Sequence, residues 1–285
     1  MDRDGAPVAP LALPRGRLGT GLLVVGMALL TLLTLVAVLA PALAPFDPLA
    51  STARVGDPLP PDASHWLGTD ALGRDVLSRL IFGARLSLGV AAAAMLVTLL
   101  IGVSIGLGAG YAGGPVDTLL MRLTDLMLGL PALLLAVALA AVLEPSTRNL
   151  LLVIGLVSWT TVARVVRGEV HALGERDFVT AARALGAGPL RQSLRHLLPG
   201  VARTIVSLAA LSTSSTLLLE AGLSFLGLGV PPPAPSFGRM VGEGATYYRT
   251  APWLIVFPGF AIMLAVLACN LVAQGLLARR RAGEQ

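Results

Sequence analysis

The side chains that could do chemistry are few in this sequence and lie far apart along it. There is one cysteine, Cys269, and there are three histidines, and neither an H-E-x-x-H nor a G-x-S-x-G pattern occurs. All 21 positive side chains are arginine, which excludes a P-loop lysine, a Schiff-base lysine and a lysine general base. We therefore predict no catalytic residue, no bound cofactor and no metal site, and any ATP chemistry has to come from a partner.

Two glycine patterns lie in one apolar run. Residues 108–113 match G-x-G-x-x-G, but they end the run instead of following a strand, so dinucleotide binding is not expected. Gly102, Gly106 and Gly110 recur at every fourth residue. This spacing predicts close packing of one helix against another within a membrane bundle.

The composition indicates a membrane protein, because 55% of the residues are hydrophobic, 13% are charged and the mean hydropathy is +0.81. A spanning helix needs about 20 apolar residues. Three uncharged windows are long enough alone, and three more reach that length if Asp125, Arg164 and Glu220 lie in the headgroup region. We predict an all-α polytopic protein with six transmembrane helices, in the windows 18–46, 86–116, 126–143, 149–163, 204–219 and 250–278.

The arginines predict the orientation of these spans. With the N-terminus inside, fourteen of the 21 arginines fall on the inner side, and an excess of positive charge marks the cytoplasmic side. Both termini are therefore expected in the cytoplasm. Arg15 and Arg17, the apolar run after them and Ala42-Leu43-Ala44 also imitate a secretory signal with its cleavage site. The run is too long for a signal core of about 7 to 15 residues, which favours a retained first helix.

The outer segment, residues 45–85, is rich in proline and aspartate. Near its end Val76, Leu77, Leu80 and Ile81 recur at helical spacing. This pattern predicts an amphipathic helix lying at the outer surface, and an ordinary connector half-buried against the bundle fits equally well.

The one large inner loop covers residues 168–200. Asp177 can cap a short helix over residues 178–185, and Gly186 lies where a left-handed residue follows a helix C-cap. Pro189 can begin a second helix over 190–198, which Pro199 would end. Phe178 and Leu185 offer apolar side chains to a groove, so two short helices with a glycine elbow between them predict a partner-binding surface.

Two further charges allow specific predictions. Arg122 and Asp125, three residues apart near the inner surface, are expected to pair with each other. Glu220 lies near the outer end of a span, where it can line the substrate route or serve as a hydrogen-bonded structural carboxylate, and we favour the second. His65, His171 and His196 belong to different segments and are not expected to converge on a metal.

Three segments together resemble a known family. Residues 180–186 (T-A-A-R-A-L-G), followed by Leu198-Pro199, resemble the EAA loop of binding-protein-dependent ABC importer permeases, with Thr180 where the family pattern has Glu. Residues 65–79 with 83–87, and residues 220–238, resemble the dipeptide, oligopeptide and nickel branch of that superfamily, of the DppC/OppC type. The likeness covers nearly the whole chain.

The resemblance implies a type I ABC importer permease with a MetI-like core. Residues 1–85 would form an N-terminal tail, the first transmembrane helix and an extracytoplasmic segment, residues 86–278 the five-helix core with its coupling loop at about 168–200, and residues 279–285 a cytoplasmic tail. The residues expected to couple to the ATPase are Phe178, Thr180, Ala181, Ala182, Leu185, Gly186, Leu198 and Pro199.

The resemblance also implies partners, a location and a substrate class. The expected partners are a second homologous permease, two cytoplasmic ABC ATPases that bind ATP and Mg, an extracytoplasmic substrate-binding protein and the lipid bilayer, with no nucleic acid. The location would be the bacterial cytoplasmic (inner) membrane, with several passes. The substrate would be a di- or oligopeptide, with nickel or another small solute as the alternative. An ion-coupled secondary transporter is a rival of another class, but the windows show neither repeated halves nor central relays.

Overall fold

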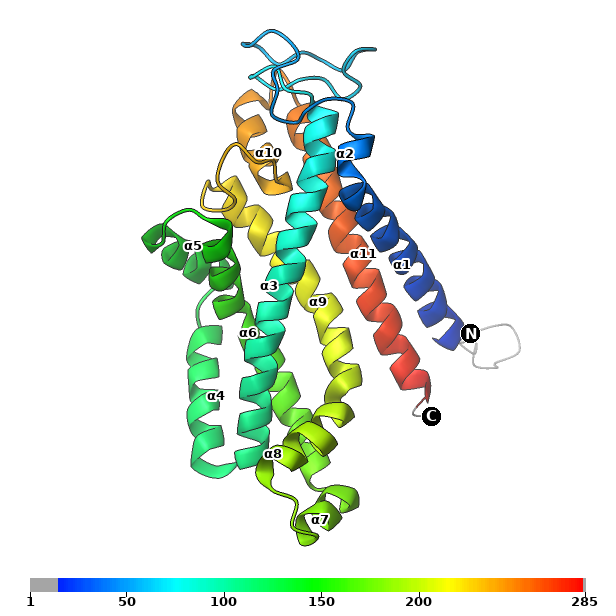
Figure 1. The fold of residues 1–285 in the computed structure, drawn as a ribbon, viewed down its shortest axis with the longest axis vertical. Helices are drawn as coiled ribbons and strands as arrows, with labels where there is room; N and C mark the ends of the chain where they lie inside the picture. Colours follow the sequence, from blue (N-terminus) through cyan, green and yellow to red (C-terminus); the bar gives the residue numbers. More distant parts are fainter. Residues whose placement is uncertain (1–14, 284–285) are drawn as a thin grey trace, which may run out of the picture.

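The computed structural model describes residues 15–283, and within them the chain is helical without a β-strand (Figure 1). This confirms the predicted all-α class. The elements in chain order are α1 (Arg15–Val38), α2 (Ala40–Leu43), α3 (Val76–Ala112), α4 (Gly114–Leu128), α5 (Ala132–Val142), α6 (Thr147–Gly174), α7 (Asp177–Ala184), α8 (Pro189–Gln192), the π-helix η1 (Ser193–Leu197), α9 (Leu198–Phe225), α10 (Phe237–Gly244), the 3₁₀-helix η2 (Ala245–Tyr247) and α11 (Trp253–Gly283).

Five helical stretches in the described residues are long and apolar enough to cross a membrane. They are Gly19–Val38, Val76–Ala112, Thr147–Gly174, Pro189–Phe225 and Trp253–Arg279. A sixth crossing would have to combine α4 and α5, which are bent by 89° where they meet. Pro131 lies at this break and explains it. Proline has no backbone N–H to donate, and it disfavours helical geometry in the residue before it. The window from Asp125 to Glu144 therefore holds only the end of α4 and the 11-residue helix α5, which is too short to span a membrane alone.

The glycine repeat on α3 packs against α6, as predicted. A Cβ atom placed on Gly102 would lie 2.6 Å from Cβ of Val162, and one on Gly106 would lie 2.7 Å from the carbonyl oxygen of Ala163. Gly110 repeats the arrangement one turn further along. Only glycine fits at such distances, so the two helix backbones approach closely.

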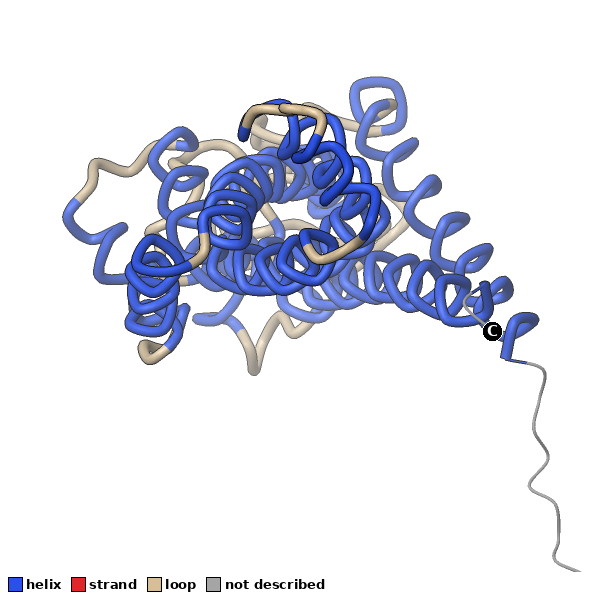
Figure 2. Tube along the Cα trace, turned by 90° about the horizontal axis from the view of Figure 1, so that it is seen from below, coloured by secondary structure: helices blue, strands red, loops and turns tan. Residues whose placement is uncertain are grey.

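The helix α1 lies alongside α11 at the edge of the bundle (Figure 1). Small residues again allow the approach, since a Cβ on Gly26 would lie 2.7 Å from the Val272 backbone nitrogen. Figure 2 shows helices extending to one side of the bundle, toward the end of α11. The start of α1 and the end of α11 point toward the end of the molecule that carries α7 and α8 (Figure 1).

No separate surface helix precedes the second span, so the prediction of an amphipathic helix at the outer surface is wrong. Val76 is the first residue of α3, which continues without a break to Ala112. Val76 and Arg79 are both 1% exposed. Arg79 can be buried because it pairs with Asp70 and Glu243 inside the protein. The division placed between residues 85 and 86 falls inside this continuous helix.

Candidate functional site

The inner elbow, residues 177–199, begins with the short helix α7 at the lower end of the molecule (Figure 1). The predicted cap by Asp177 is wrong. Arg176 occupies the N-cap position with extended backbone angles and without a side-chain cap, and Asp177 is the first helical residue. A carboxylate in the first turn still interacts favourably with the positive end of the helix.

Gly186 ends α7 in the conformation that its position predicted. Its φ angle is +82°, and the amide of Ala187 donates to the carbonyl of Ala182 at 3.0 Å while the amide of Gly186 donates to Arg183 at 3.0 Å. These two bonds form a Schellman motif, which satisfies carbonyls that the helix leaves free. The elbow angle is therefore fixed by backbone bonding at a residue that tolerates a positive φ.

The second helix of the elbow begins at Pro189, as predicted, but it does not end at Pro199. The π-helix Ser193–Leu197 leads directly from α8 into α9, so helical structure continues from Pro189 to Phe225. Proline lacks the amide for an i to i−4 bond and its ring crowds the carbonyl four residues earlier. The widened π turn just before Pro199 accommodates both effects.

The elbow presents apolar side chains to solvent. Leu185 is 89% exposed, Leu190 is 73% exposed and Phe178 is 50% exposed, whereas Val179 is fully buried against α6 and α9. Of the other residues expected to couple, Thr180, Ala181, Gly186 and Pro199 are exposed, and Ala182 and Leu198 are half-buried. One buried valine thus anchors α7 while its outer face stays open.

At the opposite end, a turn over residues 65–75 leads the outer segment into α3. Asp75 caps α3, since one carboxylate oxygen accepts from the Ser78 amide at 2.7 Å and the other lies 3.0 Å from Nδ1 of His65. Asp70 holds the turn by accepting from the amides of Leu72 and Arg74 at 2.9 and 3.0 Å. The aspartates of the outer segment therefore build local structure.

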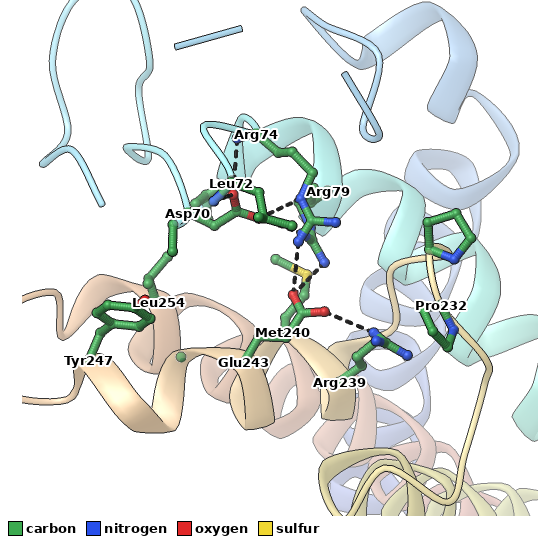
Figure 3. Close-up of a pocket in the computed structure, with 14 residues that line it drawn as sticks. Asp70, Leu72, Arg74, Arg79, Pro232, Arg239, Met240, Glu243, Tyr247 and Leu254 are labelled. Carbon is green, nitrogen blue, oxygen red and sulfur yellow. Dashed lines mark hydrogen bonds and ion pairs between the residues drawn. The ribbon is translucent and has the colours of Figure 1, made fainter. Parts of the chain in front are cut away.

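Five charged side chains converge between this turn and α10 (Figure 3). We call them the outer ion cluster: Asp70, Arg74, Arg79, Arg239 and Glu243. Arg79 reaches across the centre to both carboxylates, with its Nη2 2.7 Å from Glu243 Oε2. Arg74 joins the same two carboxylates at 2.8 and 3.2 Å. Arg239 donates to Glu243 Oε1 at 2.8 Å. The cluster thus ties α10 to the start of α3.

A cavity of about 380 Å³ lies beside the outer ion cluster (Figure 3). All five charged residues line it. Its other walls are mostly apolar, and are formed by Ala71, Leu72, Val76, Pro232, Pro233, Met240, Gly244, Tyr247 and Leu254. The turn, the segment between α9 and α10, α10 itself and the start of α11 all contribute. A mostly apolar cavity with a few converging charges has the make-up of a ligand site.

Glu220 lies in α9 and is completely buried. The Ser224 hydroxyl donates to its Oε1 at 2.7 Å, and Ser87 of α3 and Ser236 lie beside the same carboxyl. Within the described residues Oε2 has no hydrogen-bond partner, and Glu220 does not line the outer cavity. Ser87 in turn accepts from the amide of Phe237 at 3.1 Å, so this buried polar group connects α3, α9 and α10.

The predicted pairing of Arg122 with Asp125 is wrong. Asp125 accepts from Nη2 of Arg164 on α6 at 2.5 Å, and both of these side chains are more than half exposed. Asp117 pairs with Arg167 of α6 in the same way, at 2.5 and 2.6 Å. Both acidic residues of α4 thus pair with arginines of the neighbouring helix instead of within their own helix.

The fold and the two ends define a class of protein. Several apolar helices long enough to span a membrane carry an exposed apolar elbow at one end and a charged cavity at the other. Such an arrangement is compatible with a membrane transport subunit. The chain belongs to the family described as "binding-protein-dependent transport system inner membrane component", whose model matches residues 102–281. It is a multi-pass membrane permease subunit and not an enzyme.

Named relatives are similar over most of the chain. The dipeptide transport system permease protein DppC of Alkalihalophilus pseudofirmus is 40% identical over 255 residues, which cover 90% of this chain and 84% of the relative. The di/tripeptide permease protein DppC of Pseudomonas aeruginosa is 42% identical over 259 residues, 88% of this chain and 84% of the relative. The nickel transport system permease protein NikC of Escherichia coli is 40% identical over 250 residues, 87% and 89% of the two chains.

The outer ion cluster was not predicted from the sequence, although three of its five members lie inside a segment that resembles the family. Asp70, Arg74 and Arg79 belong to the segment 65–79, whereas Arg239 and Glu243 lie more than 150 residues later. One local signal was present: Arg239 and Glu243 are four apart, at helix-pair spacing. Nothing local indicates that Glu243 also reaches Arg79.

Proposed function

We propose that this chain is one permease subunit of an ATP-driven, binding-protein-dependent importer that carries di- or oligopeptides across the bacterial cytoplasmic membrane. Membership of the transport family, together with about 40% identity to dipeptide permeases over nearly nine tenths of the chain, supports the proposal most strongly. The partners are a second homologous permease, two cytoplasmic ATPases that bind ATP and Mg, and an extracytoplasmic binding protein.

In this proposal the inner elbow receives the ATPase. Its exposed Leu185, Leu190 and Phe178 suit an apolar groove, and covering them removes their side chains from water. Movement of the elbow reaches the membrane because helix continues from Pro189 into α9. An inner end that binds the ATPase and an outer end that meets the binding protein fit a transporter that alternates between an inward-open and an outward-open state.

The direct test is uptake by the reconstituted transporter. Proteoliposomes that contain both permeases and both ATPases, supplied with the binding protein, should accumulate labelled dipeptide with ATP and should continue when a protonophore removes the membrane potential. Uptake that ignores ATP and follows the potential would contradict the proposal.

Nickel is a second candidate, because the nickel permease relative is as similar as the dipeptide relatives. An uptake assay with the same vesicles, ⁶³Ni²⁺ and the binding protein of this importer distinguishes nickel from peptide as the substrate. We expect peptide uptake to be the larger activity by more than about tenfold, which corresponds to about 1.4 kcal/mol of discrimination.

We also propose six spans with both termini in the cytoplasm, counting the bent pair α4 and α5 as one. The position of fourteen arginines on one side supports this orientation. In a Cys269→Ser background, a cysteine placed at position 56 should react with an impermeant thiol reagent added outside intact cells. A cysteine placed at position 187 should react only after the cells are opened, and the reverse labelling pattern would contradict the model.

A further inference from the structure

The outer ion cluster carries an uneven set of charges. Three guanidinium groups, of Arg74, Arg79 and Arg239, face two carboxylates, of Asp70 and Glu243, so one positive charge is left without a counter-ion inside the cluster. Arg74 and Arg79 are almost completely buried. Positive charge held away from water favours an anion beside it.

The two carboxylates have little capacity left. Asp70 accepts four hydrogen bonds, two from backbone amides and two from guanidinium groups. Glu243 accepts from all three arginines. A further cation would therefore meet saturated carboxylates next to three positive groups, which makes a ligand ammonium unfavourable here.

Arg239 retains free donors at the cavity. Its Nε donates to Glu243 and its Nη1 donates to the carbonyl of Val230 at 3.2 Å, whereas its Nη2 has no partner within the described residues. The Arg239 side chain is 22% exposed and that of Glu243 is 33% exposed, so both can be reached from outside. A guanidinium with a free edge is the group that binds carboxylates most specifically.

The apolar walls of the cavity determine which kind of ligand group can lie next to the ligand's negative charge. Leu72, Met240, Tyr247 and Leu254 form an apolar wall of the cavity, and Figure 3 shows Tyr247 and Leu254 at the end away from Arg239. At about 380 Å³ the cavity lies in the ordinary range for small-ligand sites, roughly 300–1,000 Å³. It offers more room than one acidic side chain fills, and a carboxylate with an apolar side chain next to it would occupy both walls.

We propose that this cavity binds the free C-terminal carboxylate of a short peptide at Arg239, with the C-terminal side chain of the peptide against the apolar wall. The inference rests on the proposed peptide substrate and adds a binding site for it on the permease itself. The outer end of the permease would then hold the peptide directly, in addition to the extracytoplasmic protein that delivers it.

The test uses the complete transporter in nanodiscs without the binding protein. Equilibrium dialysis measures binding of radiolabelled Ala-Phe and of its C-terminal amide. The variant Leu72→Trp fills the cavity from an exposed turn and leaves every member of the ion cluster in place, and Leu72→Ala is its matched control. Arg239→Gln tests the free guanidinium, with the melting temperature measured in parallel to detect unfolding.

We expect Ala-Phe to bind about tenfold or more tightly than its amide, because the amide lacks the charged acceptor. Leu72→Trp should weaken Ala-Phe binding by about tenfold, Leu72→Ala should change it by less than about threefold, and Arg239→Gln should abolish the preference for acid over amide. Equal binding of acid and amide, no binding of either, or unchanged binding to Leu72→Trp would each overturn the proposal.

An acidic side chain of the binding protein is the alternative occupant, and a second measurement distinguishes it. If Leu72→Trp weakens docking of the peptide-free binding protein while Ala-Phe does not bind the transporter, the peptide site is overturned. The proposed function is judged separately, by ATP-dependent peptide uptake of the wild-type vesicles. Uptake with no Ala-Phe site refutes only the inference, and absence of any peptide uptake refutes the function.

Discussion

The two ends of this molecule are built in opposite ways. At the inner elbow, backbone hydrogen bonds fix the shape, one buried valine anchors α7 and the large apolar side chains face water. At the outer end, side chains from segments more than 150 residues apart form ion pairs, and Arg79, which takes part in two of them, is almost completely buried. The surface proposed to receive a partner is open and locally defined, whereas the junction that holds several segments together uses buried, long-range contacts.

The comparison predicts its largest effect at the outer end. Arg79→Ala removes the most deeply buried of the guanidinium groups that pair with Asp70 and Glu243, and breaking a buried ion pair costs about 3–5 kcal/mol. The melting temperature of the purified complex should fall strongly. Arg85→Ala is the matched control, because Arg85 is exposed on the same helix and has no ion pair within the described residues. Equal melting of the two variants would remove the distinction between the ends.

Glu220 should produce the next largest effect. Glu220→Ala leaves the buried Ser224 hydroxyl without its acceptor, which costs about 1–3 kcal/mol, and Glu220→Gln should lower stability less because it keeps an oxygen acceptor. Uptake of all peptides should fall in proportion to the loss of assembled complex. A stable complex that fails only with free-amine peptides would show instead that Glu220 belongs to the substrate route.

The elbow should respond in coupling more than in global stability. Gly186→Val places a β-branched residue at φ +82°, which costs about 1–2 kcal/mol locally. Membrane insertion should be normal, while co-purification of the ATPases and substrate-stimulated ATP hydrolysis should fall. Gly188→Val is the matched control, since Gly188 has φ −68° and open space around a Cβ. If both variants couple normally, the elbow is not the ATPase contact.

The exposed ion pair between α4 and α6 should matter least. Asp125 and Arg164 are each more than half exposed, and such pairs contribute about 0–1 kcal/mol. Asp125→Asn should therefore leave the melting temperature of the complex within a degree or two of wild type, and raising the salt concentration should remove any difference. A loss comparable to that of Arg79→Ala would mean that Asp125 is buried against a partner.

The same contrast explains what the sequence could predict. The shape of the elbow depends on residues that are neighbours in the chain. Gly186 therefore predicted its turn, and Pro189 predicted the start of its second helix. The end of that second helix was wrong because a π turn, which depends on packing, relieves the clash at Pro199. The helical spacing of Val76, Leu77, Leu80 and Ile81 is found in the first turns of α3, but the charges beside it suggested the outer surface where the fold supplies Asp70 and Glu243 to Arg79. Periodicity gives the faces of a helix, and only the tertiary structure shows what each face meets.

The helix α3 has 37 residues, and at a rise of about 1.5 Å each it is roughly 55 Å long. A bilayer with its headgroups is about 40–45 Å thick, and its hydrocarbon core is about 30 Å. Unless α3 tilts steeply, at least about 10 Å of it has to project from the membrane. The turn that holds Arg79 is at the very start of the helix, so projection at this end would lift the outer ion cluster clear of the lipid. The cavity beside the cluster, with the partly exposed Arg239, would then face water and soluble proteins above the membrane surface.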